Sequence, residues 1–198
     1  VQAPSQIAFT VKVRGKASHA GFAPQDGVHA IRIAAAAIAE MAIGRIGDDT
    51  TVNVGQIEGG RASNIVPDYC EVSGELRSFS HKKALEELAK VEQIFAKEAE
   101  KRGGSIEFIR DICYQAYKTD ENESVVKEFQ KACMACGIKS SLIATFGGSD
   151  QNKMSEHGIP GIVMASAMHQ VHSCQEYTEV SEMAQVAGIV SELLQMKE

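Results

Sequence analysis

Three segments of this 198-residue chain contain side chains capable of chemistry, and the first two also contain glycines. The first is Gly15–Gly21, in which His19 lies in a glycine-flanked loop directly after an alternating apolar segment. Such a loop leaves a histidine free to reach a ligand, and imidazole can exchange a proton near neutral pH. A surface histidine on an ordinary turn has the same pattern, and spacing alone favours that second interpretation.

The second segment is Phe146–Asp150, which follows a short apolar run and contains Gly147, Gly148 and Ser149. Ligands of α/β proteins bind at the carboxyl ends of strands, where glycines let backbone N–H groups approach them. The alternative is an ordinary turn from strand to helix, with Asp150 as the N-cap of the helix.

The third segment, His169–Glu176, contains two histidines and a carboxylate. A zinc site needs three or four protein ligands, so one histidine acting with distant ligands is compatible with this pattern and a self-contained site is not supported. The pair Cys133 and Cys136 is the other pattern that could indicate a metal or redox centre. Both cysteines fall on an apolar helix face, which favours buried thiols.

The composition excludes several classes of protein. Hydrophobic residues make up 44% and charged residues 23% of the chain, as in ordinary globular proteins. A formal net charge of −6 argues against binding to nucleic acid or to an anionic membrane surface. No run reaches the ~20 apolar residues of a membrane span. Five scattered cysteines and no visible signal peptide favour a cytoplasmic location, and a start at Val1 rather than Met suggests a piece of a longer protein.

Hydrophobic periodicity predicts the order β-α-β-β-α-β across residues 6–114. Alternating apolar residues predict strands near 7–13, 51–57, 69–78 and 106–112, and apolar stripes predict helices near 28–41 and 80–102. Ser80 is a predicted N-cap, and Gly103 with Gly104 a predicted helix end. This order is that of a ferredoxin-like unit, an antiparallel sheet with two helices on one face.

The remainder of the chain has a different pattern. One helix is predicted to end at Gly137, and a second carries Met183 and Leu194 on its apolar face. The runs Leu142–Thr145 and Ile162–Ala165 are nearly all apolar, which is typical of parallel strands covered on both faces. Two such strands form only part of a doubly wound sheet, so we expect an incomplete α/β segment that needs more sheet from elsewhere.

Several short motifs, each weak alone, are informative because of their order along the chain. They are Gly15-Lys16-Ala17-Ser18-His19-Ala20-Gly21, Asn53-Val54-Gly55, Glu58-Gly59-Gly60, Asn64-Ile65-Val66-Pro67, Glu75-Leu76-Arg77-Ser78, Gly147-Gly148-Ser149-Asp150-Gln151-Asn152 and Val171-His172-Ser173-x-x-Glu176. Together they resemble the peptidase T and carboxypeptidase G family of two-zinc exopeptidases, and the peptidase T-like branch most closely. The resemblance covers essentially the whole chain.

The resemblance implies a layout and an activity. Residues 1–116 would be a ferredoxin-like lid that pairs with a second lid in a homodimer, and residues 117–198 the last part of the zinc-binding catalytic domain. The complete protein would be a zinc-dependent exopeptidase that hydrolyses short peptides, such as a tripeptidase or aminopeptidase.

The resemblance also implies roles for three residues of the lid. His19 resembles the histidine that reaches the partner subunit's active site and stabilises the developing oxyanion. Asn64 resembles an asparagine that contacts substrate across the dimer. Arg77 resembles an arginine that binds a substrate carboxylate through its fixed fork of donors. The alternative for Arg77 is a strand residue paired with Glu71 or Glu75.

In the C-terminal part, Gly148 and Ser149 resemble a loop that lines the substrate pocket, and His172 resembles a single zinc ligand. The family's other ligands, beginning with a His-x-Asp motif, and its general-base glutamate are not in this sequence. We therefore expect the chain alone to be inactive, since zinc must be held and its water deprotonated. Ala167 stands where relatives usually have glycine.

Two other functions fit the same features. One is an amidohydrolase that removes the acyl group from N-acyl amino acids, because such enzymes share these motifs. The other is a dimerisation or binding module without catalysis, since an alanine-rich helix and an edge strand can form an interface.

Overall fold

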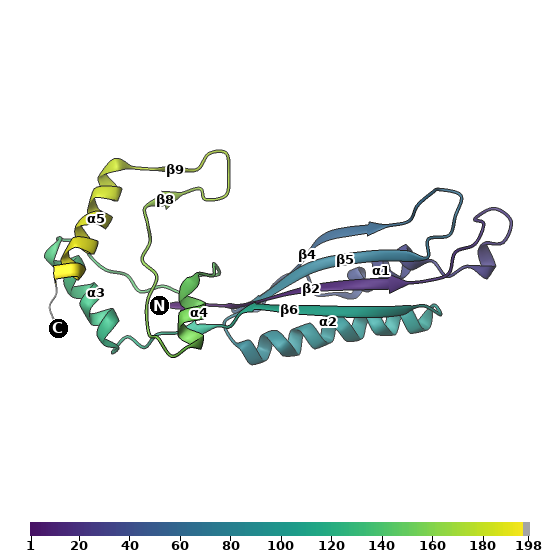
Figure 1. Cartoon of the computed structure of the whole chain (residues 1–198), viewed down its shortest axis with the longest axis horizontal. Helices are drawn as coiled ribbons and strands as arrows, with labels where there is room; N and C mark the ends of the chain where they lie inside the picture. The colour runs from purple at the N-terminus through teal and green to yellow at the C-terminus, as the bar shows by residue number, and fades with distance from the viewer. Residues whose placement is uncertain (196–198) are drawn as a thin grey trace. The chain divides into compact units, whose positions relative to one another are not determined.

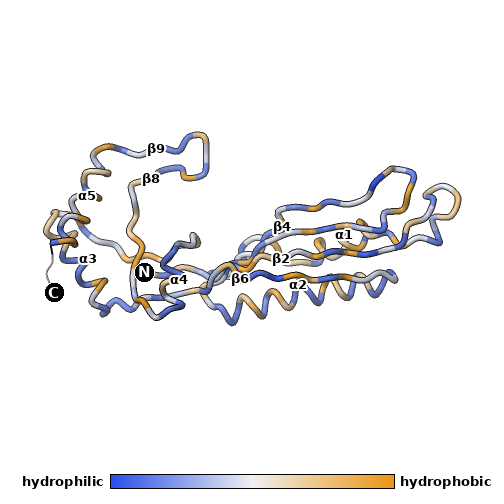
Figure 2. Tube along the Cα trace, in the orientation of Figure 1, coloured by the Kyte–Doolittle hydropathy of each residue, from blue (hydrophilic) through white to orange (hydrophobic). Residues whose placement is uncertain are grey.

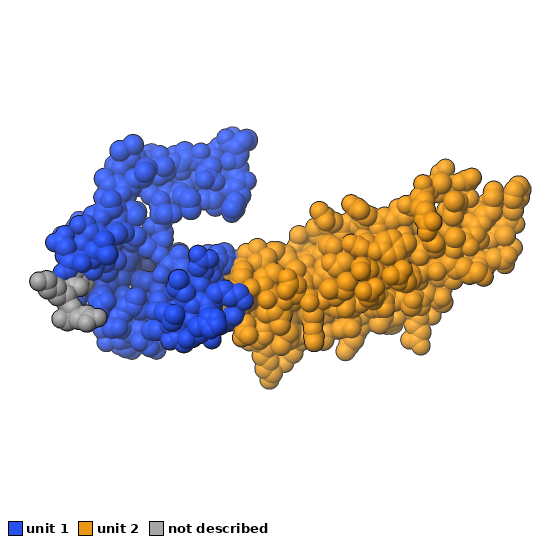
Figure 3. All heavy atoms as spheres, viewed as in Figure 1, with its two compact units in different colours: residues 1–3, 117–198 blue, residues 4–116 orange. Residues whose placement is uncertain are grey.

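The protein, seen in a computed structural model that describes residues 1–195, is a mixed α+β structure with an antiparallel sheet. The predicted α+β class and the predicted antiparallel sheet are confirmed. The chain divides into two compact units, one of residues 4–116 and the other of residues 1–3 with the segment from Tyr117 onward (Figure 3). Residues 1–3 belong to the second unit because β1 (Gln2–Ala3) pairs with β7 (Tyr117–Lys118).

The first unit is built on a five-stranded sheet. Its strand order is β3-β4-β5-β2-β6, and all neighbours are antiparallel; the strands are β2 (Ser5–Arg14), β3 (Gly44–Ile46), β4 (Thr50–Gly59), β5 (Tyr69–Ser78) and β6 (Ser105–Tyr114). β2 and β5 pair over their whole length, from Ser5 opposite Ser78 to Arg14 opposite Tyr69. Sequence periodicity predicts the four long strands within a few residues, because alternate residues are buried.

Two helices, α1 (Ala30–Glu40) and α2 (His81–Lys101), pack on the sheet (Figure 1). The core between them contains the inward residues of β2 and the apolar stripe of α2, including Phe9 and Phe95. Hydrophobic and hydrophilic positions recur in turn along α2 (Figure 2). As predicted, Ser80 caps α2, its hydroxyl accepting the Lys83 N–H at 3.3 Å. Burying each such large apolar side chain contributes ~1.5–3 kcal/mol.

In its described part, the second unit holds three helices, two two-stranded pairs and long irregular segments. The helices are α3 (Ser124–Ala135), α4 (Asp150–Glu156) and α5 (Val180–Gln195), and the second pair is β8 (Met168–His169) with β9 (Tyr177–Thr178). η1 (Pro24–Asp26), a short 3-10 helix, belongs to the first unit. The thiol of Cys133 is buried between α3 and α5 as predicted, and burial raises its pKa.

The prediction of strands at Leu142–Thr145 and Ile162–Ala165 is wrong for the described structure. Both runs are irregular, apart from one parallel bridge between Ala144 and Gln2. A parallel strand needs backbone partners beside it, and the described part of the second unit provides only that bridge. Apolar side chains of both runs stay exposed, with Ile143 at 63% and Val163 at 48%. No described helix has the length and hydrophobicity required to span a bilayer.

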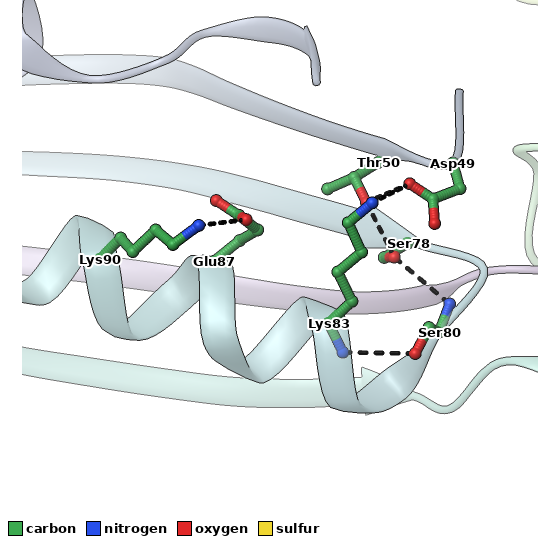
Figure 4. A network of polar contacts seen from close by, with 7 residues as sticks. All are labelled: Asp49, Thr50, Ser78, Ser80, Lys83, Glu87 and Lys90. Atoms are coloured by element: carbon green, nitrogen blue, oxygen red, sulfur yellow. Dashed lines mark hydrogen bonds and ion pairs between the residues drawn. The ribbon is translucent and has the colours of Figure 1, made fainter. Parts of the chain in front are cut away.

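A network of polar contacts joins the turn before β4 to the start of α2 (Figure 4). Lys83 Nζ donates to Asp49 Oδ1 at 2.5 Å, and Thr50 Oγ1 donates to Ser78 Oγ at 2.9 Å. Ser78 Oγ also accepts the Ser80 N–H at 3.3 Å. Thr50 and Ser78 are fully buried, and a buried hydroxyl left unpaired costs ~1–3 kcal/mol, so this network stabilises the unit.

Gly74 allows the core to close over the middle of β5. A Cβ built there would lie less than 3.0 Å from the Asn53 carbonyl oxygen and from the Phe9 ring, so neither neighbour leaves room for a methyl group. We predict that Gly74→Ala lowers the free energy of unfolding by ~1–3 kcal/mol, as overpacking does. Gly55→Ala on β4 is the matched control, because its Cβ would meet its nearest neighbour at 3.7 Å. Urea denaturation measures both, and equal stability of the two variants would contradict the prediction.

The network in Figure 4 predicts an acid-dependent stability. The hydrogen bond from Lys83 lowers the pKa of Asp49 in the folded state. Because the folded-state pKa is below the unfolded one, this stabilisation is present above the unfolded pKa and is lost as the pH falls through the folded one. Asp49→Asn should therefore reduce the free energy of unfolding at neutral pH, and the difference should shrink between about pH 5 and about pH 2.

Urea denaturation across this pH range measures the effect. Asp48→Asn removes the neighbouring exposed carboxylate and serves as the control. A difference between wild type and Asp49→Asn that does not change with pH would show that the Asp49–Lys83 contact does not stabilise the fold.

Candidate functional site

His19 lies in the exposed loop between β2 and α1, and its ring is held by the loop itself. Nδ1 accepts the backbone N–H of Gly21 at 3.1 Å and that of Phe22 at 3.2 Å. The ring stacks on Phe22, with 4.3 Å between centroids and 26° between planes. The sequence pattern identified His19 but gave no sign of these contacts.

Asn64 lies beside His19. The Asn64 carbonyl oxygen accepts the Ala20 N–H at 3.0 Å, and the Ser18 carbonyl oxygen accepts the Val66 N–H at 2.9 Å. A bridge also joins His19 to Ile65. The two loops meet because antiparallel pairing puts the end of β2 next to the start of β5, at one end of the sheet (Figure 1).

Two glycines let this pair of loops pack closely. A Cβ at Gly15 would lie less than 3.0 Å from the Val28 carbonyl oxygen, where the Lys16 N–H bonds that oxygen at 2.9 Å. A Cβ at Gly27 would collide with Ser18 Oγ. The loop that carries His19 therefore requires glycine at both of its ends.

Arg77 lies on the opposite face of the sheet from the helices, near the other end of β5. Its Nε donates to Glu75 Oε1 at 2.8 Å, and this bond raises the pKa of the guanidinium. Gln6 Nε2 donates to the second oxygen of the same carboxylate at 2.5 Å. The alternative pairing with Glu75 thus exists in the structure, and a carboxylate substrate would have to compete with it.

His172 lies at the exposed tip of the segment that joins β8 to β9. Its backbone N–H donates to Glu176 Oε2 at 2.8 Å, and its φ is +63°. Ala167, Gln170 and His172 all adopt the left-handed region, which costs a non-glycine residue ~1–2 kcal/mol. Ala167, where the sequence resemblance leads us to expect glycine, therefore adopts the conformation that glycine favours.

Gly148 is exposed, and Ser149 is the N-cap of α4. The Ser149 N–H donates to Asn152 Oδ1 at 3.0 Å. Asp150 is the first residue of α4, so the predicted alternative of an Asp150 cap is displaced by one residue. This turn is an ordinary capped helix start, and its exposed glycine leaves the backbone open to a ligand.

The structure brings some of the predicted site residues together and not others. His19 and Asn64 are neighbours in the first unit, whereas Arg77 lies near the other end of the same sheet. In residues 1–195, no hydrogen bond or ion pair joins His172 to Gly148 or Ser149, and no three His, Cys, Asp or Glu side chains converge as a metal site would require.

Sequence reasoning missed the contacts that hold the His172 segment. His169 Nε2 lies 2.6 Å from Glu182 Oε2 on α5, and its ring stacks on Tyr177 with centroids 4.8 Å apart. The residue pattern alone indicates His169 only as a candidate zinc ligand. No periodic pattern links residues 169 and 182, because the contact depends on how the hairpin folds onto α5.

Comparison with known proteins identifies a family and a number of similar chains. Residues 4–103 match the model of the peptidase dimerisation domain of the M20 family. A crystal structure of aminopeptidase PepT from Bacillus cereus is 37% identical, with a TM-score of 0.86 over 98% of this chain and 53% of that one. A tripeptidase from Staphylococcus aureus is 32% identical, with a TM-score of 0.93 over 98% and 52%.

The uncharacterised protein YqjE of Bacillus subtilis is 34% identical over 98% of this chain and 53% of its own length. The chain thus spans about half the length of each of these relatives.

The contact between His169 and Glu182 predicts a local effect on the hairpin. Strands of two residues are too short to be stable alone, so the tip that carries His172 depends on this tether. Glu182→Gln should raise amide hydrogen exchange in residues 168–178 roughly two- to fivefold, as expected for an exposed pair worth ~0.5–1 kcal/mol. Glu179→Gln is the control on the same segment. Equal exchange in the two variants would exclude the tether.

Proposed function

The chain belongs to the M20 family of peptidase dimerisation domains, and on this premise we propose that it forms the lid and C-terminal catalytic portion of a metal-dependent exopeptidase for short peptides. The similarity to an aminopeptidase and a tripeptidase over nearly the whole chain supports this activity. The observation that carries the proposal is the exposed His19 ring, whose Nδ1 is occupied by backbone amides, which leaves Nε2 to donate.

We further propose that the first unit is a ferredoxin-like lid that dimerises. The strand order β6-β2-β5-β4, with α1 after β2 and α2 after β5, supports this topology. β3 pairs only with residues 50–52 of β4, so in the described structure the rest of that strand is an open edge. Open edges of this kind pair readily with a second copy of the same strand.

In the proposed reaction, His19 of one subunit donates from Nε2–H to the oxyanion that forms in the partner's active site. A donor of this kind is worth roughly 10²–10³-fold in kcat. Asn64, whose backbone is bonded to the same loop, would contact substrate beside it. Arg77 would bind the substrate carboxylate, once Glu75 is displaced from its guanidinium.

Only one residue of this chain, His172, is proposed as a metal ligand. The exposed imidazole of His172 suits a single zinc ligand, and Gly148 and Ser149 would line the adjoining substrate pocket. Zinc needs three or four ligands and no group of three candidate ligands converges within residues 1–195, so in this proposal the other ligands of the two-zinc site would come from outside this set. A bound zinc would supply the activation of water.

The proposal predicts a loss of activity in the complete protein. His19→Ala should lower kcat on tripeptides by roughly 10²–10³-fold, because it removes a donor used only in the transition state. His157→Ala, which changes another exposed histidine, is the matched control. Full kcat in His19→Ala would refute the role of His19.

Three further assays test the arrangement. Mixing His19→Ala and His172→Gln subunits should restore part of the activity, since a mixed dimer would contain one intact site. The 198-residue chain alone with excess zinc should not turn over di- or tripeptides, and robust turnover would refute the division of ligands. Faster turnover of N-acyl amino acids than of tripeptides by the complete protein would identify an amidohydrolase instead. No turnover of either substrate by the complete protein would indicate a binding module.

The cytoplasm is the proposed location of the protein. A net charge of −6 and five free cysteines support a cytoplasmic protein without nucleic-acid or membrane partners. Fractionation of cells that express the complete protein would test the location.

A further inference from the structure

The loop that carries His19 determines which nitrogen of the ring holds the proton. The backbone N–H groups of Gly21 and Phe22 both point at Nδ1, at 3.1 and 3.2 Å. A backbone amide can only donate, so Nδ1 must present a lone pair. The proton of the neutral ring is therefore on Nε2, and none of the described residues makes a hydrogen bond to that atom.

Phe22 occupies an unusual place for a large apolar side chain. It is 86% exposed, so burial in a core does not explain its position. One face of its ring instead stacks on the imidazole of His19, with 4.3 Å between the centroids. Stacked aromatic rings attract each other, so Phe22 restricts rotation of the imidazole about its own side-chain bonds.

The main chain on both sides of His19 is already anchored. Ala20 donates to the Asn64 carbonyl oxygen, and Ser18 accepts from the Val66 N–H. With the backbone held in this way, rotation of the imidazole is the remaining freedom. The two amides and the Phe22 ring both restrict this rotation.

We propose that Phe22 is a positioning residue, which together with the backbone amides of Gly21 and Phe22 holds His19 as the Nε2–H tautomer in one orientation. Its value for catalysis rests on the proposed function, in which a donor that is already oriented needs no rearrangement as charge develops. The tautomer itself is a property of the 198-residue chain and can be measured without substrate or metal.

The first test is long-range proton–nitrogen NMR of the imidazoles in the 198-residue chain, with His19→Gln used for assignment. His19 should give the pattern of a ring protonated on Nε2, and so should His29, whose Nδ1 accepts the Arg32 N–H at 3.2 Å. His157 gives the reference of an exposed ring. Phe22→Ala should move the nitrogen shifts of His19 toward those of His157, and Phe22→Tyr should preserve them. A Nδ1–H pattern for His19, or unchanged shifts in Phe22→Ala, would overturn the inference.

The second test measures turnover by the complete protein. Phe22→Ala should lower kcat roughly 10-fold with little change in KM, because misorientation of a reacting group weakens the transition state selectively. Phe22→Tyr should restore kcat, and Met134→Ala, which truncates another exposed apolar side chain, should leave it unchanged. Unchanged kcat in Phe22→Ala would overturn the positioning role.

The two tests separate this inference from the proposed function. If His19 has the Nε2–H pattern and responds to Phe22→Ala, while His19→Ala keeps full turnover, the proposed function fails and the tautomer assignment stands. If His19→Ala abolishes turnover and Phe22→Ala changes neither shifts nor kcat, the inference fails and the proposed function stands.

Discussion

The pairing of β2 with β5 along ten residues is the constraint on which the rest of the first unit depends. Their inward side chains form the floor of the core that α1 and α2 cover, and Gly74 leaves space there for the Phe9 ring. Because the two strands are antiparallel, one end of the pair gathers the loops of His19 and Asn64. The other end gathers the network that caps α2. A shift of one residue in this register would turn the core face toward solvent and separate the two loops.

In the loop of His19, too, backbone hydrogen bonds position a side chain. The Ala20 N–H and the Ser18 carbonyl oxygen are bonded to the loop of Asn64, the N–H groups of Gly21 and Phe22 point at the imidazole, and the ring becomes an acceptor on one side. Directional hydrogen bonds thus convert a flexible side chain into an oriented donor. An exposed phenylalanine is tolerated because its ring has a partner on one face. A rigid scaffold with an ordered loop is how proteins generally place reactive groups.

The second unit lacks such a scaffold in its described part. Its helices α3 and α5 pack around Cys133 and Ile189, but the apolar runs beside them have almost no backbone partners. Apolar side chains in these runs, such as Ile143 and Val163, remain exposed in the described structure. His172 is consequently displayed on a hairpin stabilised by side-chain contacts, with His169 and Glu182 as its main link to a helix.

The amino-acid sequence by itself determined the long strands and both covering helices of the first unit, because period-two and period-3.6 burial are local properties of the chain. It also determined the Ser80 cap, and its motifs made His19 and Asn64 candidate site residues. Only the tertiary structure decided that His19 is locked by Gly21 and Phe22 and that Arg77 is held by Glu75. The same is true of the irregular runs at residues 142–145 and 162–165, since strand formation there depends on partners distant in the chain. Contacts of this kind depend on chain geometry and hydrogen-bond direction, which residue types and spacing do not encode locally.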